Sequence, residues 1–333
     1  MKRICLIYIL LMSAALSLTA QTESATFVRR AVVEEYTGTW CGNCPRGIVG
    51  LQRLTEDFGD RVIPIAVHSG DVMEIAAYPA LQPGDGIPAC NLDRKGKLDP
   101  YNGGGTRGFF HYGIDVEVAS ELEQPVEAGI TLTAQWNDAQ LWDVRFTATT
   151  IFNINSPEAP YRLAFILLED GLTGEGKQWE QVNYFSYEEG TSNFADDDMK
   201  EWRDAPYNVG NMVYNHVPVN TLGIKDGIAG SIQAPIVSGT PQTYSNIVTT
   251  LNVRVIQDKS HLSAVVLLLN TETGEIVNAA KADILPYGTD AVQTVAIPNR
   301  PNGQSLNDLQ GRRVSPSSQA KGVYIRNHRK FIK

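Results

Sequence analysis

The stretch "TGTWCGNCPRG", residues 37–47, decides the fold, because it places two cysteines two residues apart with a tryptophan before them and a proline after them. A CxxC pair occurs in redox centres, in static disulfides and in metal sites. A structural zinc site takes four Cys or His ligands in paired spacings. The chain has no second CxxC, and no paired motif is formed by the histidines His68, His111, His216 and His261. We therefore expect no metal and no cofactor, and the redox and static interpretations both remain open.

The segments on either side of the pair have the pattern of a β-α-β unit. Residues 29–40 and 61–70 read as buried β-strands, and residues 44–59 read as an amphipathic helix with one apolar face, formed by Ile48, Leu51, Leu54 and Phe58. The cysteines then lie at the helix N-terminus, where unpaired N–H groups and the positive end of the helix dipole favour a thiolate. We expect Cys41 to be the more exposed, attacking cysteine and Cys44 to resolve the mixed disulfide.

These residues resemble the thioredoxin family. "WCGNCP", which begins at Trp40, is similar to the thioredoxin active site, and "GIP" at 86–88 is similar to the segment that carries a cis-proline facing the two sulfurs. The resemblance covers residues 27–124 and implies that Pro88 is cis and holds the backbone of a substrate. It also implies that Glu35 is a buried acid that accepts the proton of the resolving cysteine. A solvent-facing position on an edge strand is the alternative for Glu35.

Two features depart from the thioredoxin pattern. The first is an insertion at residues 98–111, "LDPYNGGGTRGFFH". The second is a third cysteine, Cys90, two residues beyond Pro88 on the same face of its strand. Cys90 has three interpretations: a regulatory thiol, a thiol that diverts the chemistry, or a small buried residue. We favour burial.

Length and patterning suggest two domains in a chain of 333 residues with 43% hydrophobic content. Residues 1–20 have a basic start and an apolar run ending in a small residue, which is typical of a secretory signal peptide. We expect a thioredoxin-like α/β domain at 21–125 and an antiparallel β-sandwich at 126–290 that contains a long aromatic-rich insertion. Residues 291–333 form a linker and a basic tail that resembles a C-terminal sorting segment of Bacteroidetes secreted proteins.

The charge of the chain argues against one class of partner. The net charge of −9 loses the two positive charges of the signal segment on cleavage and becomes −11. Seven Lys or Arg residues and no Asp or Glu follow from Arg312 onward, so the rest of the mature chain is more acidic still. We therefore expect no nucleic-acid partner.

The whole chain resembles the twenty-eight-kilodalton outer membrane protein family of Bacteroidetes, in which a thioredoxin-like domain precedes a β-rich one. "IPIAVHSGD" around His68 and "YNHVPVN" around His216 carry this resemblance. It implies an exported protein of the periplasm, outer membrane or cell surface, with outer membrane association.

Two hypotheses about function follow. The first is a thiol-disulfide oxidoreductase acting on protein thiols and disulfides of the envelope, with Trp40, Cys41, Cys44, Glu35 and Pro88 as its site. The second is a non-catalytic surface or adhesion protein in which the CxxC pair is a structural disulfide.

Overall fold

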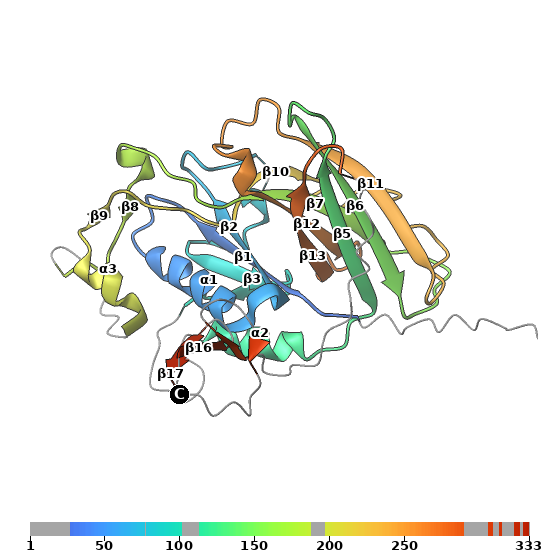
Figure 1. Ribbon diagram of the computed structural model, residues 1–333, viewed down its shortest axis with the longest axis horizontal. Helices are drawn as coiled ribbons and strands as arrows, with labels where there is room; N and C mark the ends of the chain where they lie inside the picture. Colours follow the sequence, from blue (N-terminus) through green and yellow to red (C-terminus); the bar gives the residue numbers. More distant parts are fainter. Residues whose placement is uncertain are drawn as a thin grey trace, which may run out of the picture. The chain divides into compact units, whose positions relative to one another are not determined.

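The computed structural model describes residues 27–76, 78–101, 113–187 and 197–289, together with the backbone of four short strands from residue 306 onward. The signal segment 1–20, the linker and most of the insertion at 98–111 lie outside the described residues. Residues 27–297 form one compact unit, and the strands beyond residue 306 belong to a second. The chain is mostly β-sheet with few helices (Figure 1).

The first sheet carries the CxxC segment. Its four strands lie in the order β2-β1-β3-β4, with β1 and β2 parallel and β3 antiparallel to β1. Their bounds are β1 Ala31–Thr37, β2 Val62–His68, β3 Ala89–Leu92 and β4 Lys97–Leu98. Helix α1 (Pro45–Phe58) connects β1 to β2, and α2 (Ile114–Leu122) follows the sheet. The predicted β-α-β unit is confirmed.

Helix α1 buries a slightly different face from the predicted one. Leu51 and Leu54 are buried and Phe58 packs at the margin of the core, as predicted. Ile48 is only half-buried, and Val49 takes its place in the core. The reason is close packing at glycines, since a Cβ on Gly50 would overlap with the backbone of Pro100. The packed face of the helix therefore contains Gly50 and Val49 beside Leu51, Leu54 and Phe58, and Ile48 lies at its margin.

The second sheet has seven strands in the order β10-β7-β12-β13-β5-β6-β11. All neighbours are antiparallel except β13 and β5, which pair in parallel through Ile284 and Leu285. The bounds are β5 Ala128–Trp136, β6 Asp143–Phe152, β7 Tyr161–Glu169, β10 Val217–Leu222, β11 Pro241–Thr249, β12 Leu262–Asn270 and β13 Ile276–Leu285. The expected antiparallel β-sandwich is thus built from one seven-stranded sheet, whose halves are joined through the parallel pair of β13 and β5.

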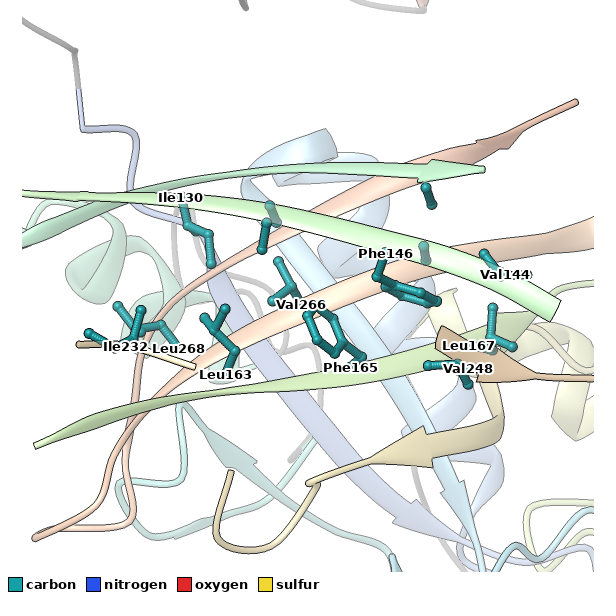
Figure 2. Packing of buried hydrophobic residues seen from close by; sticks show 14 of the residues in the cluster. Ile130, Val144, Phe146, Leu163, Phe165, Leu167, Ile232, Val248, Val266 and Leu268 are labelled. Carbon is teal, nitrogen blue, oxygen red and sulfur yellow. The ribbon is translucent and has the colours of Figure 1, made fainter. Parts of the chain in front are cut away.

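The two halves of this sheet face one another across an apolar core. Phe146 on β6 and Phe165 on β7 belong to strands that are not paired, yet their ring centroids lie 5.1 Å apart (Figure 2). The packing is sandwich-like, because β13 passes from one half to the other at its C-terminal end.

The second sheet also packs against the first. Strands β7 and β12 are buried on both faces. One face belongs to the core described above, and the other contacts β1 and β2 through a separate cluster that includes Val32, Tyr36, Ile63, Ile65, Ala164, Ile166, Val265 and Leu267. Alternate residues of β1 therefore face α1 or the second sheet.

Two smaller groups of strands complete the described chain. Between β7 and β10, strands β8 (Gln181–Val182) and β9 (Asn208–Val209) pair near helix α3 (Lys200–Asp204). In the other unit, β14 (Leu306–Asp308), β15 (Arg313–Val314), β16 (Val323–Arg326) and β17 (Arg329–Ile332) form an antiparallel sheet. Among the described residues, no helix has the length and hydropathy that crossing a membrane requires.

Candidate redox site

Cys41 and Cys44 form a disulfide at the N-terminus of α1, with their Cα atoms 5.3 Å apart. Cys44 is the residue before the helix, and its carbonyl oxygen accepts hydrogen bonds from the N–H groups of Gly47 and Ile48 at 2.8 and 3.2 Å. Cys41 is 6% exposed and Cys44 is fully buried. This order of exposure agrees with the roles predicted for the two sulfurs, although both are largely covered.

Pro88 and Trp40 both lie close to the disulfide. The Ile87–Pro88 peptide bond is cis, as predicted, and the Ile87 carbonyl oxygen lies 3.7 Å from Cys41 Sγ. The Trp40 side chain is 55% exposed and donates a hydrogen bond from Nε1 to the carbonyl oxygen of Ser69 at 2.8 Å. A cavity of about 620 Å³ opens beside Trp40 and is lined also by Val72. The fold thus places an aromatic side chain and a cis-proline next to the pair.

Glu35 is buried beneath the helix. It pairs with Ala66 of β2 and Cys90 of β3, and only 1% of its surface is exposed. The edge-strand alternative is therefore wrong. Its Oε1 has no hydrogen-bond partner within the described part of the chain. Burial raises the pKa of Glu35 to about 8, against the opposing effects of a hydrogen bond from Thr37 and the positive charge of Arg46.

Gly47 provides the space that the Glu35 carboxyl group occupies. A Cβ atom on Gly47, in the first turn of α1, would overlap with Glu35 Oε1. The carboxyl group therefore lies directly against the helix turn that follows Cys44. The sequence reasoning did not single out Gly47, because a glycine in a helix has no local pattern that identifies the group facing it.

Cys90 is a free, fully buried thiol whose Sγ lies 3.5 Å from the carbonyl oxygen of Leu98. Burial raises its pKa well above the usual range, and the nearby Glu35 acts in the same direction. A thiol in this environment is a poor nucleophile at neutral pH. The predicted burial is confirmed.

A segment from the aromatic-rich insertion covers the CxxC loop. The N–H of Val182 donates to the carbonyl oxygen of Thr39 at 2.8 Å, and the N–H of Tyr184 donates to that of Gly42 at 2.9 Å. The Tyr184 ring packs so closely on Gly42 that a Cβ there would overlap with it. We call residues 181–184 the cover segment. Sequence reasoning missed it, since residues about 140 positions apart share no local signal.

The two histidine stretches singled out by the family resemblance lie together. The His68 ring packs edge-on against Tyr214 with centroids 5.4 Å apart, and the N–H of Ala66 donates to the carbonyl oxygen of His216. His68 Nδ1 lies 2.7 Å from Asp71, whose carboxylate also accepts the N–H of Thr39 at 2.9 Å.

This contact links the His68 strand to the CxxC loop. Burial opposes ionisation of Asp71, but the hydrogen bond and charge of His68 lower the pKa of that carboxyl group. An ionised Asp71 is a strong acceptor for the Thr39 N–H. In the part of the chain that the structure describes, no three His, Cys, Asp or Glu side chains are grouped so that they could hold a metal ion.

Comparison with known proteins shows a similarity of fold. No family model matches the chain, and a search of curated proteins found no match. HBP35 of Porphyromonas gingivalis has a similar structure, with a TM-score of 0.54 and 18% identity over 92% of this chain and 98% of that chain. The overall fold is therefore shared with HBP35.

Two further solved structures have weaker similarity. A protein from Agrobacterium tumefaciens matches with a TM-score of 0.40 and 14% identity, covering 79% of this chain and 97% of that chain. A domain of the outer membrane lipoprotein Omp28 from Porphyromonas gingivalis matches with a TM-score of 0.24 and 14% identity, covering 49% of this chain and 92% of that chain.

Proposed function

We propose that this protein is a thiol-disulfide oxidoreductase of the bacterial envelope that acts on protein thiols and disulfides. The observation that carries the proposal is the Cys41–Cys44 disulfide at the N-terminus of α1. Helix N-termini stabilise a thiolate, which is the reactive form in disulfide exchange. The Ile87–Pro88 segment beside Cys41 and the buried Glu35 below the helix support the same chemistry.

The reaction proceeds in two exchanges. The Cys41 thiolate attacks one sulfur of a substrate disulfide; the substrate S–S bond breaks, a mixed disulfide forms, and the other substrate sulfur leaves as a thiolate. Cys44, as a thiolate, then attacks Cys41 Sγ and releases the second substrate sulfur. Two electrons pass from the cysteine pair to the substrate, and the pair ends as the disulfide seen here. Run in reverse, the same steps oxidise a substrate dithiol.

Glu35 and Pro88 have supporting roles in this proposal. Glu35 accepts the proton of the Cys44 thiol, because a carboxyl group with a pKa of about 8 is close to the ideal basicity for proton transfer near neutral pH. Pro88 and the preceding carbonyl group hold the substrate backbone against Cys41.

Trapping of the mixed disulfide tests the proposal. In Cys44→Ala the first exchange occurs but the second cannot, so this variant should accumulate reductant-sensitive adducts with other proteins when expressed in the envelope. Cys41→Ala is the matched control and should trap none, because it lacks the attacking sulfur. Adducts on a non-reducing gel, compared with and without reductant, give the readout. If neither variant traps a partner, the enzymatic function is excluded.

A non-catalytic surface-binding function is the second candidate, and the small exposure of Cys41 together with the cover segment favours it. In that case the disulfide is structural and resists mild reductant, because structural disulfides have potentials below about −300 mV. Failure of Cys44→Ala to trap partners, combined with such resistance, would support this candidate.

Export to the envelope is part of the proposal. It is supported by the basic start and apolar run of residues 1–20, which are typical of a secretory signal peptide. Cell fractionation with N-terminal sequencing should find a mature chain that begins near Gln21 in the periplasm or outer membrane. An uncut chain in the cytosol would contradict it.

A further inference from the structure

Gln181, the first residue of the cover segment, contacts the CxxC loop through its side chain. Its Nε2 donates to the carbonyl oxygen of Cys41 at 2.9 Å and lies 3.4 Å from that of Gly38. The residue is buried with 1% of its surface exposed. Together with Val182 and Tyr184, it gives the carbonyl groups of residues 38, 39, 41 and 42 hydrogen-bond donors from one segment.

The orientation of the Gln181 amide follows from its acceptors. Nε2 also lies 3.1 Å from the carbonyl oxygen of Val182, so three carbonyl oxygens surround it. An amide rotated by 180° would place Oε1 against those oxygens and lose every bond. The positive N–H end of the amide is therefore fixed toward the loop that contains Cys41.

This orientation favours one redox state of the pair. The disulfide is neutral, whereas the reduced pair carries negative charge when Cys41 is a thiolate. A fixed dipole with its positive end toward the loop stabilises that charge, and the interaction is stronger in a buried site, where water does not screen it.

We propose that Gln181 is a positioning residue that stabilises the reduced form of the Cys41–Cys44 pair relative to the disulfide. The inference rests on the proposed function only in taking Cys41 as the charged sulfur. It extends that function by placing control of the redox balance on a segment outside the α/β region.

Equilibration of the full mature chain with glutathione measures the equilibrium constant between the reduced and the disulfide form of the pair. One protein disulfide and two glutathione thiols give one protein dithiol and one glutathione disulfide, so two electrons pass to the protein. Gln181→Leu keeps the approximate volume and removes the donor. The hydrogen bonds of Gln181 are present with the disulfide formed, so only their strengthening by the thiolate charge changes the constant for reduction. A strengthening equal to one ordinary hydrogen bond predicts a fall of about three- to tenfold in that constant. Tenfold corresponds to about 30 mV toward a more negative potential.

A second readout separates positioning from simple stability. The pH profile of Cys41 alkylation in the reduced protein should move to higher pH in Gln181→Leu, because the thiolate loses a stabilising dipole. Gln181→Glu should show a larger fall in the constant for reduction above the pKa of the new carboxyl group, since a negative charge then faces the loop. Gln178→Leu is the matched control, because Gln178 is exposed and bonds only to the Glu175 carbonyl among the described residues.

Three outcomes would overturn the proposal. The first is a folded Gln181→Leu protein with unchanged potential and alkylation profile. The second is an equal shift in Asn183→Ala, whose side chain bonds to the carbonyls of Trp202 and Pro206 and to no part of the described CxxC loop. The third outcome requires no variant. The backbone amides of Val182 and Tyr184 in the wild-type protein would exchange hydrogen as fast as the amides of an unfolded chain.

These measurements are independent of partner trapping. A Cys44→Ala variant that traps nothing would remove the enzymatic function, while the potential of Gln181→Leu would still report on the redox balance of the pair.

Discussion

At the level of single residues, Glu34 and Glu35 show why two adjacent carboxyl groups on one strand can lie in different electrostatic environments. Their side chains point to opposite faces of β1, as alternation requires, and both faces are buried. Glu34 is paired with Arg94 and accepts a hydrogen bond from Tyr78 at 2.9 Å. Glu35 has an unpartnered Oε1 among the described residues, and its pKa is raised to about 8. The Glu35 carboxyl group is therefore suited to exchange a proton near neutral pH.

The raised pKa of Glu35 predicts a pH-dependent effect of Glu35→Gln on stability. The folded-state pKa of about 8 exceeds the ordinary value of 4.5 for a glutamate side chain, so the stability associated with protonated Glu35 is present below pH 4.5 and is lost as the pH rises to 8. Glutamine stays neutral, so the variant should gain stability over the wild type across this interval. At about 1.4 kcal/mol per pH unit, the gain is on the order of 3–5 kcal/mol by pH 8.5.

Denaturant unfolding of both oxidised proteins at pH 5 and pH 8.5 measures this difference. Other groups with shifted pKa values, such as Asp93, titrate in both proteins and cancel in the comparison. If the difference in unfolding free energy between Glu35→Gln and the wild type is the same at both pH values, Glu35 is already ionised at pH 5. That result would contradict the prediction.

Local sequence patterns identified some site residues and missed others for physical reasons. Cys41, Cys44 and Pro88 belong to short motifs whose spacing follows from a helix N-terminus and a turn. The sequence leaves the burial of Glu35 open, because it does not show that β1 lies between β2 and β3 or that the first turn of α1 packs on the Glu35 carboxyl group. Gln181 has no motif, since its role depends entirely on which loop the folded chain brings to it.

At the level of elements, the contact between α1 and β1 is set by glycines. Gly47 and Gly50 let the helix approach Glu35 and the Pro100 backbone, at the cost of helix propensity. The sequence predicted the strand-helix-strand order because apolar periodicity is local. It predicted Leu51, Leu54 and Phe58 on the packed face but not the replacement of Ile48 by Val49 in the core, because close approach depends on the residues that the helix meets.

A double-mutant cycle between Gly47 and Glu35 tests this packing. Gly47→Ala alone should destabilise the protein by about 1–3 kcal/mol, because the new methyl group overlaps with the Glu35 carboxyl group. In a Glu35→Ala background the same change should be neutral or stabilising by up to about 1 kcal/mol, since alanine is the better helix former. Additive effects of the two changes would contradict the proposed contact.

At the level of the whole molecule, residues 27–297 form one compact unit, in which the α/β region expected at 21–125 packs against strands of the β-rich region expected at 126–290. Alternation of apolar residues predicted the strands of residues 126–290. It did not predict that β7 and β12 are apolar on both faces because one face packs against β1 and β2. This packing makes the α/β region depend on strands that come much later in the chain.

This dependence predicts that a fragment of residues 21–125 does not fold alone. Removing the second sheet exposes Val32, Tyr36, Ile63, Ile65 and Val67, each fully or almost fully buried in the intact chain. Burial of such side chains contributes about 1.5–3 kcal/mol each, so their exposure cancels a typical domain stability.

Circular dichroism and chemical denaturation of the fragment and of residues 21–297 provide the measurement. The longer chain should unfold in one cooperative transition, and the fragment should show no transition. A fragment with a cooperative transition of its own would establish an independent domain.

The cover segment also has a consequence for the order of events during synthesis. Gln181 reaches a carbonyl group 140 positions earlier in the chain, and contacts of such separation form late in folding. A growing chain that has emerged only to the end of α2 already contains both cysteines but none of the residues that cover them. Until residues 181–184 are in place, its sulfurs are more accessible to oxidants and to other thiols than those of the finished protein. The contacts around the disulfide are complete only after the later strands have folded. The site is therefore among the last parts of the protein to form.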